Sequence, residues 1–445
     1  MGYHTAPYAL PLPSGESCVK NPGTAAATRN RLIAAAAVFL LAGPPALMSL
    51  SLADDDRLYD LQYEVTPVPD ANAVDVRVRI RQGRHLFREM RFDAGRISDV
   101  AGDGEVLDGG GEITWRPPSA GGELRWRASA RHERRGGGYD AWIDSDWGLF
   151  RAEDIIPRAT TRTLRDARSR TTLAFELPER WSVVTEYREV DGHVRVTSED
   201  RRFVQPSGWI VVGELGVRRE HVAGTRVAVA APTGHDVRRM DMLALLNWTL
   251  PELSRILPEP LPRLTIISAG EPMWRGGLSA PASLYLHADR PLISENGTST
   301  LLHEVMHVAM GLSATQGYDW IVEGFAEYYS LQLLYRSGSI TPSRYRSALT
   351  ELAGWADSAE SLCGRSSSGA ETAMAVTVLH ALDNEILAAS GTTHSLDDVL
   401  VDLLVANRKV TLDALRGAAS ERIGRNPNAL HIRRLPGCGK VGTGN

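Results

Sequence analysis

The sequence predicts an α+β protein, in which an N-terminal antiparallel β-sandwich-like domain is followed by a mainly α-helical domain. Residues 58–231 consist of short segments that alternate apolar and polar side chains, with glycine-rich turns between them. The pattern changes near residue 232, and from Thr298 onward nearly every segment has helical periodicity. The length of 445 residues is enough for two to three domains of about 150 residues each.

The β-rich domain is expected at residues 54–232. Its clearest strand is 74–81, in which apolar and charged side chains alternate with a period of two, as in a half-buried strand. Similar segments lie at 112–115, 123–128, 171–177, 193–196, 209–212 and 225–229. Many short strands separated by turns favour an antiparallel sandwich.

The helical domain is expected at residues 236–435, with 436–445 as a tail. It begins with a helix over 237–257 that Pro251 is expected to break or kink. Two short strands at 263–268 and 282–287 predict a small sheet. The remaining predicted helices lie at 300–310, 320–336, 342–355, 371–389, 396–405 and 412–423.

The first 53 residues predict an export segment. Basic residues up to Arg31 precede the apolar run 32–41, and small residues before Asp54 form a cleavage site after Ala53, as in a signal peptide. The alternative is an uncleaved membrane anchor at 32–53, because about 20 uncharged, mostly apolar residues can span a bilayer. Both interpretations place the rest of the chain in the periplasm or outside the cell.

Cysteine usage leaves two alternatives. Cys18 would be lost with a cleaved signal, which leaves Cys363 and Cys438. In an oxidising compartment these two residues can form a disulfide that ties the tail to the domain. They can equally be two unrelated thiols, because spacing alone does not show proximity.

Composition and charge exclude several classes of protein. The chain is 43% hydrophobic and 23% charged, which is typical of globular proteins rather than of disordered or disulfide-rich chains. Its net charge of -5 lacks the basic excess of nucleic-acid-binding proteins, so no nucleic-acid partner is expected.

The segment His303-Glu304-Val305-Met306-His307 has the pattern HExxH within a predicted helix. Side chains at i and i+4 lie on one face of a helix, so both histidines can bind one metal ion. Glu304 lies about 100° around the helix from His303 and can reach a water on that ion. Zinc lowers the pKa of such a water toward about 7, so that a carboxylate can take its proton. An exposed helix with two incidental histidines is the alternative.

A zinc hydrolase needs a third protein ligand and an open fourth position. Glu323 can supply this ligand, because the chain between His307 and Glu323 is long enough for a loop and a second, antiparallel helix. Glu327 follows one turn later on the same face. It is predicted to accept the distal N–H of a ligand histidine, and the alternative is a solvated helix carboxylate.

At these residues the chain resembles the gluzincin metallopeptidases, in particular the aminopeptidase N clan and its glycyl aminopeptidase-like families. The likeness rests on HExxH, on the run Trp-Ile-Val-Glu-Gly-Phe-Ala-Glu-Tyr-Tyr at 320–329 and, upstream, on Gly276, Gly277 and Leu278. It is looser at 378–386 and 396–400. The resemblance implies a thermolysin-like catalytic domain, one Zn²⁺, peptide or protein substrates, and a substrate strand at the glycine pair.

The chain departs from the family pattern at two places. Family aminopeptidases carry a glutamate after the glycines that holds the amino group of the substrate, whereas residues 279–281 here are Ser-Ala-Pro. The tyrosine that binds the oxyanion in the family is missing from region 366–374. Tyr345, His380 and His394 are candidates to replace it, and each also has a structural interpretation. Aminopeptidase specificity is therefore not expected.

Taken together, the sequence predicts an exported zinc metallopeptidase. His303, His307 and Glu323 are the predicted ligands, and Glu304 is the predicted general base. One alternative is a catalytically weak or inactive peptidase-like binding module that acts through its β domain. Another is an exported zinc hydrolase of a non-peptide bond. The intact Glu304 favours an enzyme, because a metal fold kept for binding needs no base.

Overall fold

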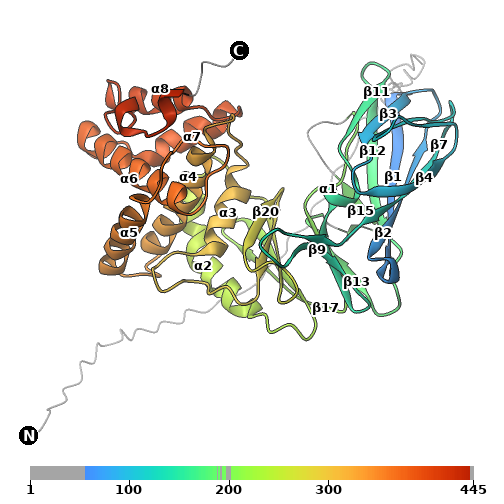
Figure 1. The fold of residues 1–445 in the computed structure, drawn as a ribbon, viewed down its shortest axis with the longest axis horizontal. Coiled ribbons are helices and arrows are strands. Elements are labelled where there is room, and N and C mark those ends of the chain that lie inside the picture. The colour runs from blue at the N-terminus through green and yellow to red at the C-terminus, as the bar shows by residue number, and fades with distance from the viewer. Residues whose placement is uncertain (1–55, 188, 191–192, 197–201, 441–445) are drawn as a thin grey trace, which may run out of the picture. The chain divides into compact units, whose positions relative to one another are not determined.

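The computed structural model describes residues 56–187, 189–190, 193–196 and 202–440 (Figure 1). The predicted export segment, residues 1–53, lies outside the described residues. Within them, no helix combines the length and the apolar character that a membrane crossing needs. The predicted order is confirmed, because a β-rich N-terminal region precedes a helical C-terminal region.

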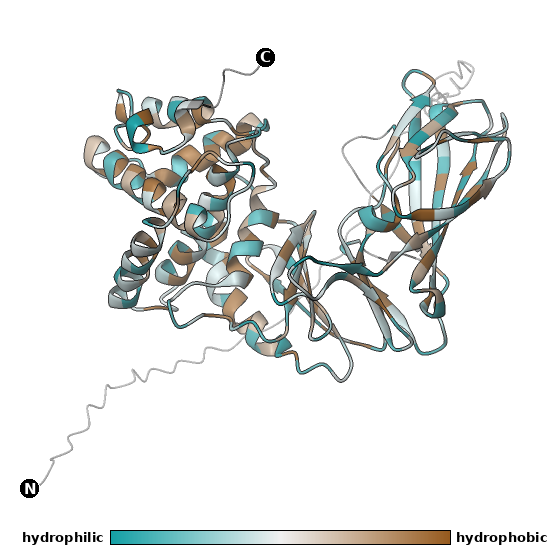
Figure 2. Ribbon diagram, viewed as in Figure 1, coloured by the Kyte–Doolittle hydropathy of each residue, from teal (hydrophilic) through white to brown (hydrophobic). Residues whose placement is uncertain are grey.

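The β-rich region is built around a seven-stranded sheet with the order β14-β15-β12-β1-β2-β7-β4. A long hairpin joins β1 (Leu58–Val68) to β2 (Ala73–Arg81), and both strands alternate buried and part-exposed residues, so one face of the sheet is apolar (Figure 2). The other strands of the sheet are β4 (Ile97–Gly102), β7 (Gly121–Ser129), β12 (Arg168–Phe175), β14 (Glu189–Val190) and β15 (His193–Val196).

A four-stranded sheet, β11-β3-β6-β5, completes the sandwich. Its Phe87 and Trp115 are fully buried in one cluster with Leu61 and Tyr63 of β1. The prediction of an antiparallel sandwich is wrong for one pair of strands, because β1 pairs with β12 in parallel. The long chain between β1 and β12 supplies the crossover that a parallel pair requires. The strands of this sheet are β3 (Phe87–Asp93), β5 (Glu105–Asp108), β6 (Glu112–Arg116) and β11 (Ala159–Thr163).

A third sheet, β13-β16-β10-β9-β8, joins the sandwich to the rest of the chain. Strand β16 (Trp209–Gly213) is buried throughout, because Ile210 and Val212 face the sandwich core while Trp209 and Val211 face a second core. The indole N–H of Trp209 donates to the carbonyl of Leu278 at 2.9 Å. The neighbouring elements are β8 (His132–Glu133), β9 (Tyr139–Ile143), β10 (Trp147–Arg151), α1 (Ala152–Ile155) and β13 (Ser182–Val184).

The fourth sheet carries the helices and has the order β17-β18-β19-β21-β20. Strands β18, β19 and β21 are parallel, whereas β17 and β20 are antiparallel edge strands. Strands β17 and β18 lie within the expected β-rich domain, residues 54–232, so the sheet spans the expected domain boundary. The strands are β17 (Leu215–Val222), β18 (Thr225–Pro232), β19 (Arg263–Ala269), β20 (Gly277–Ala280) and β21 (Ser283–His287).

Helices α2 and α3 pack on one face of this sheet. Helix α2 runs through Pro251, which was expected to break or kink it. The ends predicted for the helices 300–310 and 412–423 agree with those observed. Each helix begins after a Ser or Thr cap and stops at a glycine in the left-handed conformation. The helices are α2 (Arg239–Ile256), α3 (Thr300–Met310), α4 (Asp319–Arg336), α5 (Pro342–Ala356), α6 (Ala370–Ser390), α7 (Leu396–Ala406) and α8 (Leu412–Ile423).

Cys363 and Cys438 form a disulfide, with a distance of 4.9 Å between their Cα atoms. This decides between the two alternatives that the sequence left open. Cys363 lies between α5 and α6, and Cys438 begins a short 3-10 turn, Cys438–Lys440, near the C-terminus. The bond therefore ties the segment that leads into α6 to the tail.

Candidate metal centre

Helix α3 carries His303 and His307 on its part-exposed side. Ser299 caps the start of the helix by accepting a hydrogen bond from the backbone N–H of Leu302, and Gly311 ends it in the left-handed conformation. The opposite side of the helix is fully buried through Leu301, Leu302, Val305 and Met306. This burial fixes the rotation of the helix and hence the direction of both imidazoles.

Helix α4 packs beside α3 and presents Glu323 and Glu327 one turn apart on one side. Gly324 allows α6 to approach, since a Cβ at position 324 would lie 2.7 Å from the Cβ of Ala375. The apolar side of α4 is anchored by fully buried Trp320, Ile321, Phe325 and Tyr329. The Glu-Gly-Phe-Ala run thus combines a candidate ligand with the close packing that holds it.

The ligand atoms of His303, His307 and Glu323 all lie within 4.8 Å of one another. The two Nε2 atoms are 3.1 Å apart, and each lies 3.4 Å from an oxygen of Glu323. In a tetrahedral zinc site with bonds of about 2.0–2.1 Å, two ligand atoms are separated by about 3.3 Å. These three residues therefore fit one zinc ion and leave its fourth position for water or substrate.

Glu327 contacts the imidazole of His303 on its far side. The Nδ1 atom of His303 donates to Oε2 of Glu327 at 2.8 Å, and both side chains are 16% exposed. An ionised carboxylate only accepts, so Nδ1 carries the proton and Nε2 is left as the metal-binding nitrogen. The carboxylate of Glu327 therefore lies part-buried against the imidazole of His303 and is not a fully solvated helix carboxylate.

The charges of this cluster favour a cation among its side chains. Burial by itself lowers the pKa of His303, but hydrogen bonds to Glu323 and Glu327 outweigh it and raise that pKa. Burial raises the pKa of Glu323, and the hydrogen bonds and charges of the two histidines reverse this and lower it. The carboxylate of Glu323 is thus stabilised in its ionised form by positive charge, and a divalent ion can supply that charge.

Glu304 is buried, with 7% of its surface exposed. Burial raises the pKa of its carboxyl group, against the lowering effect of the two histidine charges. A carboxylate with a raised pKa is a stronger proton acceptor near neutral pH. Its position next to the histidines suits it for general-base chemistry.

The predicted substrate strand lies against helix α3, next to Glu304. Gly277 and Leu278 belong to β20, which packs on α3, and Gly276 directly precedes it. A Cβ at position 276 would lie 2.0 Å from the ring of Trp274, so a side chain there has no room. A Cβ at position 277 would lie 2.7 Å from Cγ of Glu304 and 2.9 Å from Cγ2 of Thr300, both in α3. Gly277 therefore lets the edge strand approach the helix that carries the candidate metal ligands.

The centre opens into a cleft of about 350 Å³ whose wall includes residues that the sequence did not identify. No sequence motif marked these residues as parts of the site. Trp355 is half exposed at this cleft. The new lining residues of most chemical interest are Trp274, Arg290, Trp355, Ser367, Ser368 and Thr372. Ser367 and Ser368 belong to residues 364–369, the cleft-wall segment, in which the backbone N–H of Ser367 donates to Asp319 of α4 at 2.9 Å.

The candidates for the oxyanion-binding role do not line the cleft. Tyr345 accepts a hydrogen bond from Gln332, His380 accepts one from Asn384, and His394 lies near Asp398. Ser367, Ser368 and Thr372, from the region that lacks the family tyrosine, bear hydroxyl groups and line the cleft, as do Thr298 and Thr300. Helical periodicity could not show this, because the direction of a loop depends on tertiary contacts.

Comparisons with known proteins show the fold. No family model and no curated protein matches the sequence. The crystal structure of an aminopeptidase N family protein from Idiomarina loihiensis is similar, with a TM-score of 0.61, 14% identity, and coverage of 78% of this chain and 70% of that chain. An M1 zinc metallopeptidase from Deinococcus radiodurans is also similar, with a TM-score of 0.53, 16% identity, and coverage of 85% and 93%. The chain thus shares the fold of these proteins.

Proposed function

We propose that this protein is an exported zinc-dependent metallopeptidase that hydrolyses peptide bonds in peptides or proteins. The observation that carries the proposal is the spacing of His303, His307 and Glu323 beside the buried carboxyl group of Glu304. The fold shared with an aminopeptidase N family protein and an M1 zinc metallopeptidase supports it.

The residues of the chain divide the chemistry between them. A zinc ion held by His303, His307 and Glu323 would polarise the scissile carbonyl and lower the pKa of a coordinated water. Glu304 accepts a proton from the attacking water as the water oxygen bonds to the carbonyl carbon. The same carboxyl group then returns the proton to the amine nitrogen as the C–N bond breaks. Glu327 keeps the imidazole of His303 in the tautomer that the site requires.

The substrate is proposed to lie along β20. This strand pairs with β21 alone among the described strands, so its other edge can hydrogen-bond an extended peptide. Among the described residues that line the cleft, the only carboxylates are Glu304, Glu323 and Glu327, and each has a role already. No further carboxylate among these lining residues can bind the free amino group of a substrate. This supports cleavage that does not depend on a free N-terminus.

The decisive experiment uses the purified mature chain and a mixed peptide library. Cleavage products are identified by mass spectrometry with zinc present, after chelation, and in Glu304→Gln. This variant keeps the size of the side chain but removes the base, so turnover should fall by about 10²–10⁴-fold while zinc content stays the same. Equal cleavage by Glu304→Gln would contradict the mechanism.

The same experiment separates the alternatives. A peptidase-like binding module would release no product from the wild-type chain and would keep its biological effect in Glu304→Gln. A hydrolase of a non-peptide bond would leave the library intact but would need both zinc and Glu304 for turnover of another substrate class, such as esters.

Export is part of the proposal, and the disulfide Cys363–Cys438 supports it. Disulfides persist mainly in oxidising compartments. We expect the mature chain to begin near Asp54, or to stay anchored through residues 32–53, on the outer side of the cytoplasmic membrane. A reporter fused after residue 445 that is active only in the cytoplasm would refute this.

A further inference from the structure

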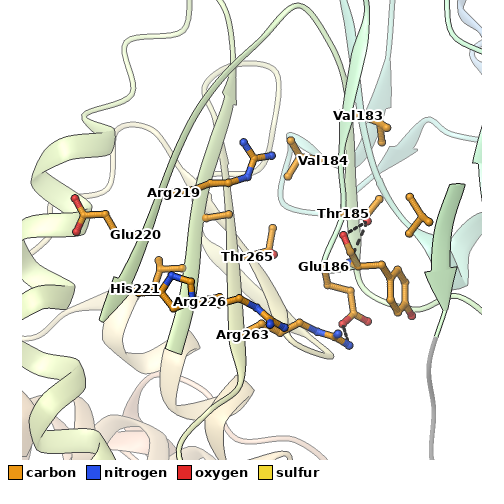
Figure 3. Close-up of a pocket in the computed structure, with 14 residues that line it drawn as sticks. Val183, Val184, Thr185, Glu186, Arg219, Glu220, His221, Arg226, Arg263 and Thr265 are labelled. Carbon is orange, nitrogen blue, oxygen red and sulfur yellow. Dashed lines mark hydrogen bonds and ion pairs between the residues drawn. The ribbon is translucent and has the colours of Figure 1, made fainter. Parts of the chain in front are cut away.

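A second cavity, of about 450 Å³, lies between β13 and the face of the β17–β18–β19 sheet opposite α2 (Figure 3). None of its lining residues belongs to the metal cleft. Its floor has two rows of residues that face one another across the strands. One row is His221, Arg226 and Arg263, and the other is Arg219, Ala228 and Thr265.

The first row places basic side chains on neighbouring strands. Arg226 pairs in register with His221 on one side and with Arg263 on the other. Like charges directly opposite one another destabilise a sheet unless an anion lies between them. Glu186 neutralises Arg263 through an ion pair of 2.7 Å.

The guanidinium groups of Arg219 and Arg226 have no such partner. No described residue makes a hydrogen bond or an ion pair with either side chain, and both are exposed, so a ligand can reach them. Glu220, the other carboxylate at this cavity, accepts a hydrogen bond from Asn247 of α2 and points away from the arginines in Figure 3. The cavity therefore holds positive charge that the described chain leaves uncompensated.

Thr265 adds a polar group on the floor. It is 4% exposed, lines the cavity, and makes no side-chain hydrogen bond with any described residue. Its hydroxyl oxygen is not fully enclosed, so the group can donate a hydrogen bond to a ligand in the cavity. Beside it, Ala228 is small and leaves space above the floor. The opposite wall is apolar through Val183 and Val184.

We propose that this cavity binds a small organic anion, whose phosphate or carboxylate group is held by Arg219, Arg226 and the hydroxyl of Thr265. Arginine forks suit both oxyanions, because they donate paired N–H groups to two oxygens. The valine wall would contact an apolar part of the ligand. The cavity volume lies within the range of small-molecule sites, about 300–1,000 Å³. The site is separate from the metal centre and does not depend on the proposed peptidase activity.

The test measures binding by calorimetry and thermal unfolding at constant ionic strength. The probes are phenyl phosphate and benzoate, which carry the same ring with different anionic groups, and inorganic phosphate, which lacks the ring. We expect saturable binding of at least one aromatic anion and a raised Tm, with inorganic phosphate weaker. The double variant Arg219→Gln and Arg226→Gln should bind at least about tenfold more weakly, a change of about 1.4 kcal/mol.

Two further variants make the result specific. Arg218→Gln alters the neighbouring residue on the opposite face of β17 and should bind as the wild type does. Thr265→Val keeps the shape of the side chain and should weaken binding by removing the hydroxyl donor alone. The proposal is overturned if none of the three probes binds saturably to the wild type, or if the double variant binds as tightly as Arg218→Gln. Circular dichroism of each variant verifies that the fold is kept.

Discussion

Gly277 lies directly against Glu304: a Cβ at position 277 would stand 2.7 Å from the Cγ atom of Glu304. Real Cβ contacts are longer, so a side chain at this position would displace the carboxyl group or the strand. The glycine is therefore needed for a close approach between β20 and α3. It places the edge of the sheet and the proposed general base within one site.

Gly277→Ala should reduce turnover without removing the metal. The methyl group would move Glu304 from its position, and small displacements of a catalytic group cost about tenfold to 10²-fold in rate. Steady-state kinetics and zinc analysis of the same sample show whether turnover falls while the zinc content is kept. Gly354→Ala is the matched control, because a Cβ there meets nothing within 4 Å. Full activity of Gly277→Ala would mean that Glu304 does not act from this position.

Purified protein should hold about one zinc per chain, because three ligands of the type zinc prefers lie at the right spacing. His303→Ala and Glu323→Ala should each lose the metal on dialysis, whereas Glu304→Gln should retain it. Elemental analysis by mass spectrometry gives the content. Full occupancy in Glu323→Ala would exclude Glu323 as a ligand.

Glu327→Gln should weaken zinc binding by about 10–100-fold, as expected for a group that orients a ligand histidine. The amide can still accept a hydrogen bond from His303, but it lacks the negative charge. Competition with a chromogenic chelator measures the affinity. The exposed Glu351 provides the control variant Glu351→Gln. An unchanged affinity would assign Glu327 a role in packing alone.

Peptides blocked at the N-terminus should be cleaved with kcat/KM values similar to those of free peptides. The described cleft holds three carboxylates, which are the proposed ligand Glu323, the proposed base Glu304, and Glu327 beside His303, so no further acid is available for an amino group. Paired acetylated and free peptides test this. A strong preference for free peptides would point to a carboxylate beyond these three, such as Glu271 or Glu295, with the zinc mechanism unchanged.

Stability should fall as the pH drops below about 6.5. His287 is fully buried, and burial lowers its pKa, so the folded state keeps this ring neutral while the unfolded chain takes up a proton. The unfolded state then binds more protons, and stability rises with pH by at most about 1.4 kcal/mol per unit for this group. Urea unfolding between pH 5 and 7.5 should show a flatter slope for His287→Gln. The exposed His85 supplies the control, His85→Gln, and an unchanged slope in His287→Gln would exclude the effect.

The sequence could predict what is fixed by local spacing. His303 and His307 share a face because they lie one helical turn apart, and the ends of α3 follow from Ser299 and Gly311. Glu323 could be predicted to lie near the two histidines because a second helix, antiparallel to α3, brings it back to them. Each of these features depends on chain geometry over a few turns.

The remainder depends on contacts between distant segments. Strand β18 alternates as sandwich strands do, and only its parallel pairing with β19 assigns it to the fourth sheet, which carries the helices. The parallel pairing of β1 with β12 has no local signature either. Arg226 and Arg263 face each other only through that same sheet register. The sequence shows that these residues are charged, but only the fold shows that they line one cavity.

The disulfide next to the cleft can form only late in synthesis of the chain. Cys363 precedes the cleft-wall segment, and its partner, Cys438, lies 75 residues further on, after the last helix. A ribosome must therefore complete nearly the whole described chain before this wall can be covalently fixed. If the chain is exported, as proposed, the bond closes only after translocation. The cleft-wall segment would then be covalently fixed only in the compartment to which the chain is exported.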